Sequence, residues 1–303
     1  MSVVIVDKIF KSYKKNNVQA LTDISFDVQE GELFGIIGPD GAGKTTLFRI
    51  LTSLMIPDSG KTAMYGFDCV KDYRKIRNLI GYMPGRFSLY QDLSVEENLT
   101  FFATVFGTTI EENYDLIKDI YIQIEPFKKR LAGKLSGGMK QKLALSCALI
   151  HKPKVLLLDE PTTGVDAVSR KEFWEMLKHL KAKDITILVS TPYMDEANLC
   201  DRVALIQNGK IMKINTPNEI VNQFDRPLLA IRSSNIYKLM NDLRELPETN
   251  TVYPFGQFVH YTDIHKSPDV ASLQNFLKSK GHQNVEINKI EPNIEDCFMA
   301  LMK

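Results

Sequence analysis

Apolar residues in positions 1–215 form short runs that alternate with helix-like segments. Val155–Leu158 and Ile185–Ser190 are almost continuous apolar runs, which is typical of strands buried on both faces of a parallel sheet. Ser169–Leu180 instead repeats its apolar residues at helical spacing. Strands that alternate with helices predict a mainly parallel α/β sheet.

Two local signals predict a hairpin and a helix start. The apolar segment Arg202–Ile206 is followed by Asn208 and Gly209, a pair typical of the tight turn in a β-hairpin. Ser94 with Glu97 three residues later forms a capping box, so a helix is expected over Val95–Val105.

The pattern changes around Thr216 and Pro217. The predicted order becomes strand, helix, strand, strand, helix, strand, with a short helix after Pro292. The first six elements are expected at 228–232, 235–246, 251–254, 257–262, 267–280 and 285–290. This is the split βαβ, ferredoxin-like order. We therefore expect two domains, residues 1–222 and 223–303, of which the second is a small α+β domain.

The composition is consistent with two domains and argues against a nucleic-acid partner. The chain has 303 residues, 44% of them hydrophobic, and a net charge of +1, which gives no electrostatic case for a nucleic-acid partner. Its four cysteines are scattered without a C-x-x-C pair, so reduced cytosolic thiols are expected. No stretch approaches the length of a membrane span, so any membrane role is expected to depend on a partner.

A glycine-rich stretch carries the strongest chemical signal. It fits G-x-x-x-x-G-K-[ST], the phosphate-binding P-loop, and lies between the apolar run Leu33–Ile37 and a predicted helix. Its residues are Gly38, Pro39, Asp40, Gly41, Ala42, Gly43, Lys44, Thr45 and Thr46. Glycines let backbone N–H groups approach a phosphate, and a helix start favours an anion. Lys44 is expected to reach the phosphates and the Thr45 hydroxyl to bind Mg²⁺.

Two further motifs follow in order along the chain. Leu135–Gln141 reads Leu-Ser-Gly-Gly-Met-Lys-Gln at a predicted helix start, and Asp159 with Glu160 closes a buried strand. This succession resembles the ATP-binding subunits of ABC transporters over residues 1–215. The tail Glu291–Phe298 resembles the C-terminal extension of the ABC-2 exporter type.

The resemblance implies a P-loop ATPase domain with a helical signature subdomain, which binds ATP and Mg²⁺. Asp159 would hold the Mg²⁺ through water, beside the Thr45 hydroxyl. Glu160 would act as general base or polarise the attacking water. Tyr13 lies where the family stacks an aromatic ring on adenine. An ordinary strand aromatic is the alternative at that position.

The family works as a head-to-tail dimer with two ATP molecules between the subunits. Ser136, Gly137 and Gly138 would then close on the nucleotide of the opposite subunit, and Asp166 matches the loop that links the two sites. The partners implied are a polytopic membrane permease and a second ATPase subunit. The location implied is the cytoplasmic face of the membrane, where the chain would be peripheral through the permease.

Two positions depart from the family pattern. Gly85 stands where the family has the Gln that touches Mg²⁺ and water, and Pro192 stands where it has a His near the γ-phosphate. Neither residue offers a side-chain donor. A slow site on this P-loop and a hetero-pair with a competent subunit are therefore expected, unless water or a neighbouring group substitutes.

The segment after Gly85 faces the permease in the family. Phe87, Leu89 and Tyr90 either line such a groove or form ordinary core between two subdomains. Two other function classes remain open: a largely non-hydrolysing regulatory subunit in a heterodimer, and a soluble ABC protein that acts on ribosomes or DNA. The neutral charge and the ABC-2-like tail count against the last of these.

Overall fold

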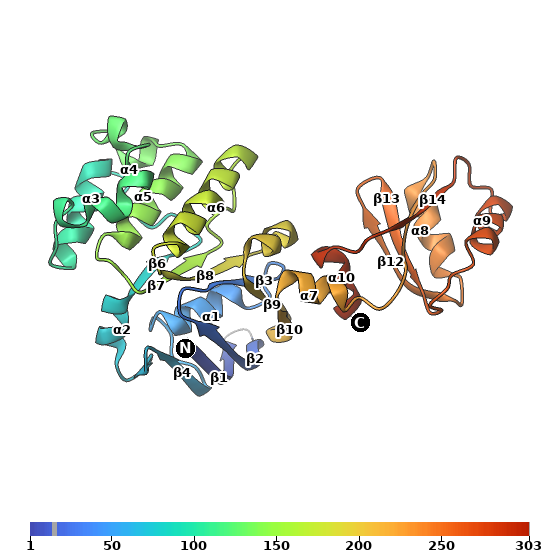
Figure 1. Ribbon diagram of the computed structural model, residues 1–303, viewed down its shortest axis with the longest axis horizontal. Coiled ribbons are helices and arrows are strands. Elements are labelled where there is room, and N and C mark those ends of the chain that lie inside the picture. Colours follow the sequence, from blue (N-terminus) through green and yellow to red (C-terminus); the bar gives the residue numbers. More distant parts are fainter. Residues whose placement is uncertain (14–16, 303) are drawn as a thin grey trace. The chain divides into compact units, whose positions relative to one another are not determined.

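The computed structural model describes residues 1–13 and 17–302, and the chain divides into two compact units, Met1–Thr216 and Pro217–Lys303 (Figure 1). The sequence pattern predicts a boundary after residue 222. Helix α7, Pro217–Asn222, instead groups with the second unit because it packs against α10, Ile294–Leu301. One of their contacts is a hydrogen bond from the Cys297 thiol to the carbonyl of Ile220, at 3.6 Å.

The first unit is built around a six-stranded sheet in the order β10-β9-β3-β8-β7-β6. Its strands are β3 Leu33–Ile37, β6 Ile80–Met83, β7 Val155–Asp159, β8 Thr186–Thr191, β9 Arg202–Gln207 and β10 Lys210–Asn215. All neighbouring pairs are parallel except β9 with β10. Every residue of β3, β7 and β8 is buried, as the continuous apolar runs predict.

A second, antiparallel sheet lies in the same unit, in the order β2-β1-β4-β5. Its strands are β1 Ser2–Tyr13, β2 Val18–Gln29, β4 Ser59–Met64 and β5 Phe67–Asp68. Helix α1, Lys44–Leu51, contributes Leu47 and Phe48 to a core cluster that also holds residues of both sheets. The alternating pattern of the sequence predicts one mainly parallel sheet and does not distinguish this second, antiparallel sheet.

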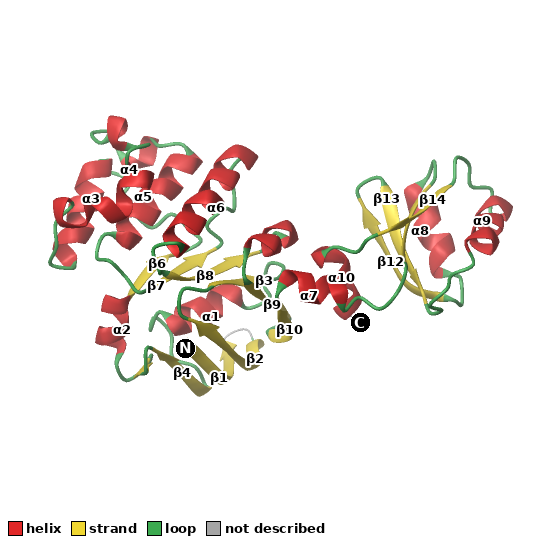
Figure 2. Ribbon diagram, in the orientation of Figure 1, coloured by secondary structure: helices red, strands yellow, loops and turns green. Residues whose placement is uncertain are grey.

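Helices and loops form the rest of the first unit (Figure 2). They are α2 Tyr73–Leu79, α3 Val95–Val105, α4 Tyr114–Tyr121, α5 Gly137–Leu149 and α6 Ala167–Lys181. Short 3-10 helices cover Glu111–Asn113, Glu125–Phe127, Ala132–Lys134 and Met194–Leu199. Helices α3, α4 and α5 occur together between β6 and β7, which matches the expected helical subdomain.

Both local predictions of the sequence hold. Ser94 Oγ accepts a hydrogen bond from the Glu97 N–H at 3.2 Å, and Glu97 accepts one from the Ser94 N–H at 2.7 Å, so α3 starts with a capping box. Asn208 and Gly209 both have positive φ, +48° and +71°, as a tight hairpin turn requires.

The second unit has the element order that the sequence predicts. It runs β11 Leu228–Arg232, α8 Ile236–Arg244, β12 Thr249–Phe255, β13 Phe258–Asp263, α9 Val270–Ser279, β14 Glu286–Ile290 and α10. The sheet order is β12-β13-β11-β14, with antiparallel pairs throughout. Leu239, Leu243, Leu273 and Leu277 of the helices join the sheet residues in one core.

A buried carboxylate fixes α10 within the second unit. Asp296 is completely buried, and its Oδ1 accepts hydrogen bonds from the Tyr253 hydroxyl and from His260 Nδ1, each at 2.6 Å. Its Oδ2 accepts the N–H of Asn293 at 2.7 Å, which completes a capping box at the start of α10. The last helix is thus tied to two strands through one side chain.

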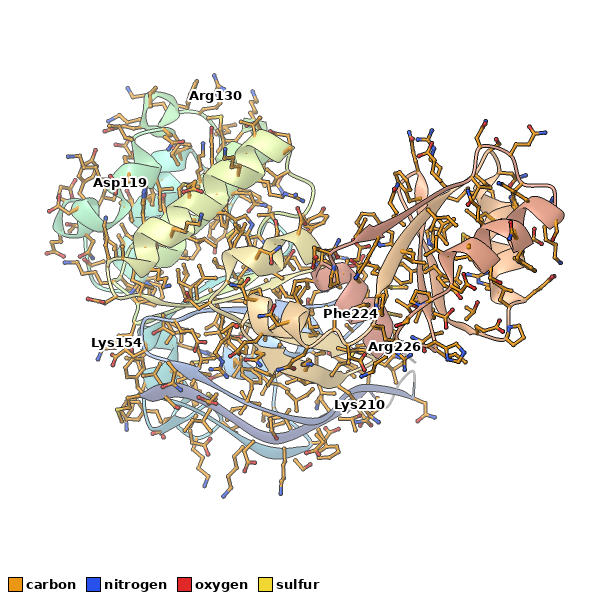
Figure 3. All side chains as sticks on the ribbon, turned by 45° about the vertical axis from the view of Figure 1, so that its right-hand side comes forward. Asp119, Arg130, Lys154, Lys210, Phe224 and Arg226 are labelled. Carbon is orange, nitrogen blue, oxygen red and sulfur yellow. The ribbon has the colours of Figure 1, made fainter. Side chains whose placement is uncertain are left out.

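The surface carries charged side chains. Asp119, Arg130, Lys154 and Lys210 are exposed (Figure 3). No helix among the residues that the structure describes is both long and apolar enough to cross a bilayer.

Candidate nucleotide-binding site

The P-loop joins the end of β3 to the start of α1, as the motif requires. Gly41 and Gly43 have φ of +77° and +105°, a conformation that L side chains rarely adopt. A side chain at Gly38 would overlap the carbonyl of Ile206, and one at Gly43 would come within 2.6 Å of the carbonyl of Ala20. These glycines therefore allow both the bend of the loop and its close packing on β2 and β9.

The strand register brings three chain segments to the P-loop. Ile37 pairs with Thr191 of β8, and Asp159 of β7 pairs with Ser190. The N–H of Gly38 donates to the carbonyl of Thr191 at 3.2 Å. The site thus lies beyond the carboxyl ends of neighbouring parallel strands, where open α/β sheets bind ligands.

Lys44 is an almost fully enclosed charge of the site. Its side chain is 2% exposed, and its Nζ donates to the carbonyls of Gly38 and Pro39 at 2.7 and 2.9 Å. The same Nζ lies 3.0 Å from Glu160 Oε1. The structure therefore brings the predicted phosphate-binding and base residues into direct contact.

Thr45 and Asp159 also meet. The Thr45 hydroxyl donates to Asp159 Oδ1 at 3.2 Å, and Ser190 Oγ donates to the same oxygen at 2.7 Å. Burial raises the pKa of Asp159, while the hydrogen bonds from Ser190 and Thr45 lower it to a smaller extent. The Coulombic interaction with Glu160 raises this pKa further.

These groups fit Mg²⁺. Among the described residues, no three His, Cys, Asp or Glu side chains form a metal cluster. Mg²⁺ does not need one, since it binds through one or two carboxylates, substrate phosphates and retained waters. A hydroxyl and a carboxylate 3.2 Å apart at the P-loop are suitable oxygen ligands.

A groove of about 400 Å³ extends from these residues. Tyr13 lines it as the last residue of β1, with its hydroxyl 3.1 Å from Thr46 Oγ1 and 3.6 Å from Met55 Sδ. It is thus both a strand residue and a wall of the groove. Four further residues line the groove, namely Val18, Gln19, Ala20 and Asn208. The first three carry no motif in the sequence, and the Asn-Gly motif at Asn208 predicts only a turn.

The Leu-Ser-Gly-Gly segment forms a separate helix start. Ser136 is the N-cap of α5, and its Oγ accepts the Met139 N–H at 3.4 Å. A Cβ at Gly138 would lie 2.7 Å from Ser169 Oγ of α6, whereas one at Gly137 would meet only the Gly164 carbonyl, at 3.7 Å. In the part of the chain that is described, no hydrogen bond joins this segment to Lys44, Asp159 or Glu160.

Asp166 has a local structural role. Its Oδ1 accepts the N–H groups of Val168 and Ser169 at 3.1 and 3.0 Å, so it is the N-cap of α6. The hydrogen bond from Ser169 holds the pKa of Asp166 below its usual value. The structure does not bring its side chain to the P-loop of the same chain.

Both departures from the family pattern lie next to the end of β7 or β8. A Cβ at Gly85 would come within 2.9 Å of the Asp159 carbonyl, so the backbone here leaves little room for a side chain. Pro192 follows β8, and the next N–H, that of Tyr193, donates to Thr191 Oγ1 at 3.1 Å.

The apolar segment after Gly85 divides between a groove and the surface. Leu89 is buried and lines a groove of about 370 Å³ together with Tyr82, Phe102 and Phe106. Tyr90 is 47% exposed and packs edge-on against Phe101, and the Phe87 ring lies under the Lys140 ammonium. Of the three side chains, only Leu89 lines this groove.

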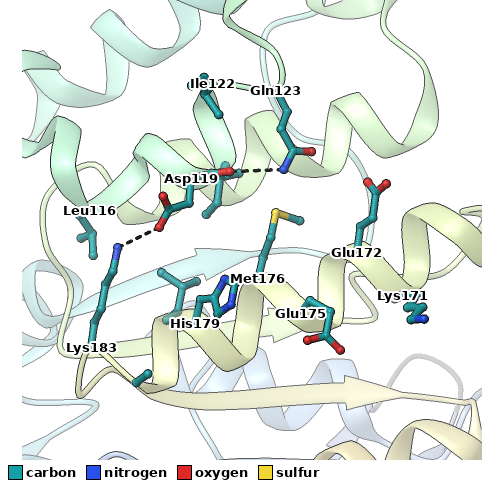
Figure 4. Close-up of a pocket in the computed structure, with 13 residues that line it drawn as sticks. Leu116, Asp119, Ile122, Gln123, Lys171, Glu172, Glu175, Met176, His179 and Lys183 are labelled. Atoms are coloured by element: carbon teal, nitrogen blue, oxygen red, sulfur yellow. Dashed lines mark hydrogen bonds and ion pairs between the residues drawn. The ribbon is translucent and has the colours of Figure 1, made fainter.

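A larger groove, of about 710 Å³, lies between α4 and α6 and holds no P-loop residue. Figure 4 shows Lys183 pointing toward Asp119 at one end, where their charged atoms are 3.3 Å apart. Met176 and Leu180 of α6 contribute to its apolar lining. The nucleotide site is therefore not the roomiest concavity of the first unit.

Comparison with known proteins agrees with the fold and the site. Residues 21–163 match the family described as ABC transporter. The chain is 36% identical over 305 residues to "Probable multidrug ABC transporter ATP-binding protein YbhF" of Escherichia coli (strain K12), covering 99% of the chain and 52% of that protein. It is 31% identical to "Nod factor export ATP-binding protein I" of Rhizobium sp. (strain N33), over 99% and 98%.

Solved structures give the same result. A structure of cbiO1 from Clostridium perfringens, part of the ABC transporter complex cbiONQ, matches with 27% identity and a TM-score of 0.65, covering 73% of this chain and 91% of that one. A dimeric ATP-binding cassette in a post-hydrolysis state with ADP and Pi matches with 25% identity and a TM-score of 0.64, over 70% and 98%.

The chain belongs to the ABC transporter family, and its first unit has the ABC ATPase fold. This confirms the family and the fold class that the three motifs predict. The chain spans about half the length of the first curated relatives that it matches.

Proposed function

We propose that this chain is the ATP-binding, energy-coupling subunit of an ABC-2 type exporter. The observation that carries the proposal is the convergence of Lys44, Thr45, Asp159 and Glu160 at one end of the parallel sheet, beside a groove of about 400 Å³. The names of relatives support the exporter type, since one is a Nod factor export protein and another a "Linearmycin resistance ATP-binding protein LnrL".

Each residue has a defined role in this proposal. The Lys44 ammonium and the backbone N–H groups of residues 38–46 bind the phosphates, and Tyr13 packs against the base. Thr45 and Asp159 hold Mg²⁺, which when bound neutralises charge on the phosphates. Glu160 orients or deprotonates the attacking water, for which its side chain is 21% exposed.

The remaining motif residues act between subunits. Ser136, Gly137 and Gly138 lie at an exposed helix start whose N–H groups suit an anion on a second ATPase chain. Asp166 shapes the start of α6 as the link between the two sites. A polytopic permease docks in the groove that Leu89 lines and holds the chain at the cytoplasmic face of the membrane.

We also propose that the chain's own P-loop site hydrolyses ATP slowly. Gly85 and Pro192 supply no side-chain donor, and the loss of one preorganised donor typically costs about 10²–10³ in rate. A hetero-pair with a competent subunit is therefore favoured over a homodimer. A largely non-hydrolysing regulatory subunit is the second candidate, and the same two positions favour it.

Nucleotide binding is tested by calorimetry with Mg-ATP. Lys44→Ala should abolish binding, because it removes the cation that the phosphates meet. Lys142→Ala is the matched control, because its ammonium pairs with Glu172 at 2.8 Å, away from the P-loop. Unchanged binding by Lys44→Ala would refute the proposed site.

Permease docking is tested separately by membrane association. Ser88 is exposed and lines the same groove as Leu89, so Ser88→Arg fills the groove without disturbing the core. This variant should bind ATP normally and no longer sediment with membranes that contain the permease. Thr100→Arg, at an exposed position of α3 outside the groove, should still sediment. Equal sedimentation of both variants would contradict docking at this groove.

A further inference from the structure

Ser190 is a completely buried hydroxyl between the two acidic residues of the site. It lies on β8, opposite Asp159 of β7 in the strand register. Its Oγ donates to Asp159 Oδ1 at 2.7 Å and accepts the N–H of Glu160 at 3.0 Å. One side chain thus contacts both residues at the end of β7.

The two hydrogen bonds use the hydroxyl in both directions. A hydroxyl has one donor and two acceptor positions, so Ser190 can serve a carboxylate and a backbone N–H together. The Glu160 N–H is shared with the Ser190 carbonyl, also at 3.0 Å. Alanine would lose both side-chain contacts, and a cysteine thiol would replace them only weakly.

The hydrogen bonds of Ser190 restrict the geometry of both Asp159 and Glu160. Glu160 has a φ of +51°, which is uncommon for a residue other than glycine and requires support from its surroundings. Asp159 accepts from Thr45 and Ser190 through Oδ1 alone, and its Oδ2 accepts no hydrogen bond from the residues that the structure describes. The carboxylate is therefore oriented through one oxygen while the other stays available.

We propose that Ser190 is a positioning residue that orients Asp159 toward Mg²⁺ and fixes the backbone of Glu160. The inference rests on the proposed nucleotide site, to which it adds a residue outside the known motifs. Groups that orient a metal ligand typically change metal affinity by about 10–100-fold when they are removed. Ser190 should accordingly influence the Mg²⁺ requirement of nucleotide binding more than nucleotide binding itself.

The test measures ADP binding by calorimetry, first in EDTA and then across a Mg²⁺ titration. For Ser190→Ala we expect the Mg²⁺ concentration at half-maximal effect to rise about tenfold or more, with ADP affinity in EDTA unchanged. Ser190→Thr, which keeps the hydroxyl, should restore the wild-type midpoint. Ser146→Ala is the matched control, since Ser146 is equally buried and its Oγ donates only to the Lys142 carbonyl of its own helix.

A wild-type Mg²⁺ midpoint in Ser190→Ala would overturn the inference. An equal loss of ADP affinity with and without Mg²⁺ would overturn it as well, because that result describes a general packing role. If Ser190→Ala does not fold, Ser190→Cys keeps most of the volume and is judged by the same midpoint. If the wild-type chain and Ser146→Ala bind no ADP at all, the proposed nucleotide site itself is refuted, and this inference with it.

Discussion

The ammonium of Lys44 lies 3.0 Å from the carboxylate of Glu160, and the lysine side chain is almost fully enclosed. The residue proposed to bind phosphate is thus paired with the residue proposed to act on water. A nucleotide phosphate must take over this contact with Lys44. Glu160 therefore competes with the phosphate for the same cation.

Glu160→Gln should increase the affinity of the isolated chain for ADP. A partly exposed ion pair is worth about 0.5–1 kcal/mol, so the gain should be about two- to fivefold by calorimetry. Asp40→Asn is the control, because it removes an exposed carboxylate of the same loop that does not contact Lys44. An equal gain in both variants would show a general charge effect in place of competition.

Substitution by aspartate should have different effects at Gly137 and at Gly138. Gly137→Asp has room, so it should leave ADP binding by the isolated chain unchanged and nearly stop ATP hydrolysis by the assembled transporter. Gly138→Asp would press on Ser169, so it should also lower the thermal stability of the chain. Full transporter activity of Gly137→Asp would contradict a role of this segment across the subunit interface.

Local sequence signals predicted much of this molecule. The P-loop, the Asn208–Gly209 turn and the capping box at Ser94 each depend on residues only a few positions apart, and the structure has all three. The element order of the C-terminal unit also follows from alternating local patterns.

Contacts between distant segments account for what the sequence did not predict. Ser190 becomes important only because β8 pairs with β7, and the crowding at Gly85 depends on the position of the Asp159 carbonyl. The N-cap role of Asp166 has a local signal, because an Asp just before a helix is a typical N-cap, whereas the resemblance to the family indicates only a loop that links two sites. Helix α7 groups with the second unit through α10, and the contact between Ile220 and Cys297 spans 77 residues of the chain, so no local pattern encodes it.

We expect the two units to fold separately. A chain that ends at Thr216 keeps both sheets and every P-loop contact of the first unit, so it should remain monodisperse and bind ADP like the full chain. A second chain that ends at Gln223 adds α7 without α10 and should aggregate more readily than the chain that ends at Thr216, because Ile220 of α7 is then exposed. Loss of ADP binding in both truncated chains would refute the boundary.

Acid should destabilise the second unit through Asp296. Burial alone raises the pKa of Asp296, but hydrogen bonds from His260, Tyr253 and the Asn293 N–H outweigh it, so the pKa lies below the usual 3.8. A carboxyl whose folded pKa is depressed contributes stability above its unfolded pKa, and that contribution is lost as the pH falls through the folded value.

Asp296→Asn should therefore lower the free energy of unfolding of residues 217–303 at about pH 6 and flatten its decline below pH 3.8. Asp269→Asn is the control, because it removes the same formal charge at the N-cap of α9, away from the buried cluster around Asp296. Denaturant unfolding at several pH values measures both effects. Parallel pH profiles for wild type and Asp296→Asn would contradict the assignment.

The rate at which the purified chain hydrolyses saturating Mg-ATP tests the slow-site proposal most directly. Gly85 is crowded by the Asp159 carbonyl, so Pro192→His is a cleaner restoration than Gly85→Gln alone, and the double variant should be the fastest. We expect the unmodified chain to bind Mg-ATP, to turn it over at well below about 1 s⁻¹ and to gain rate when these residues are restored. Turnover by the unmodified chain alone at about 1 s⁻¹ or more would contradict this expectation.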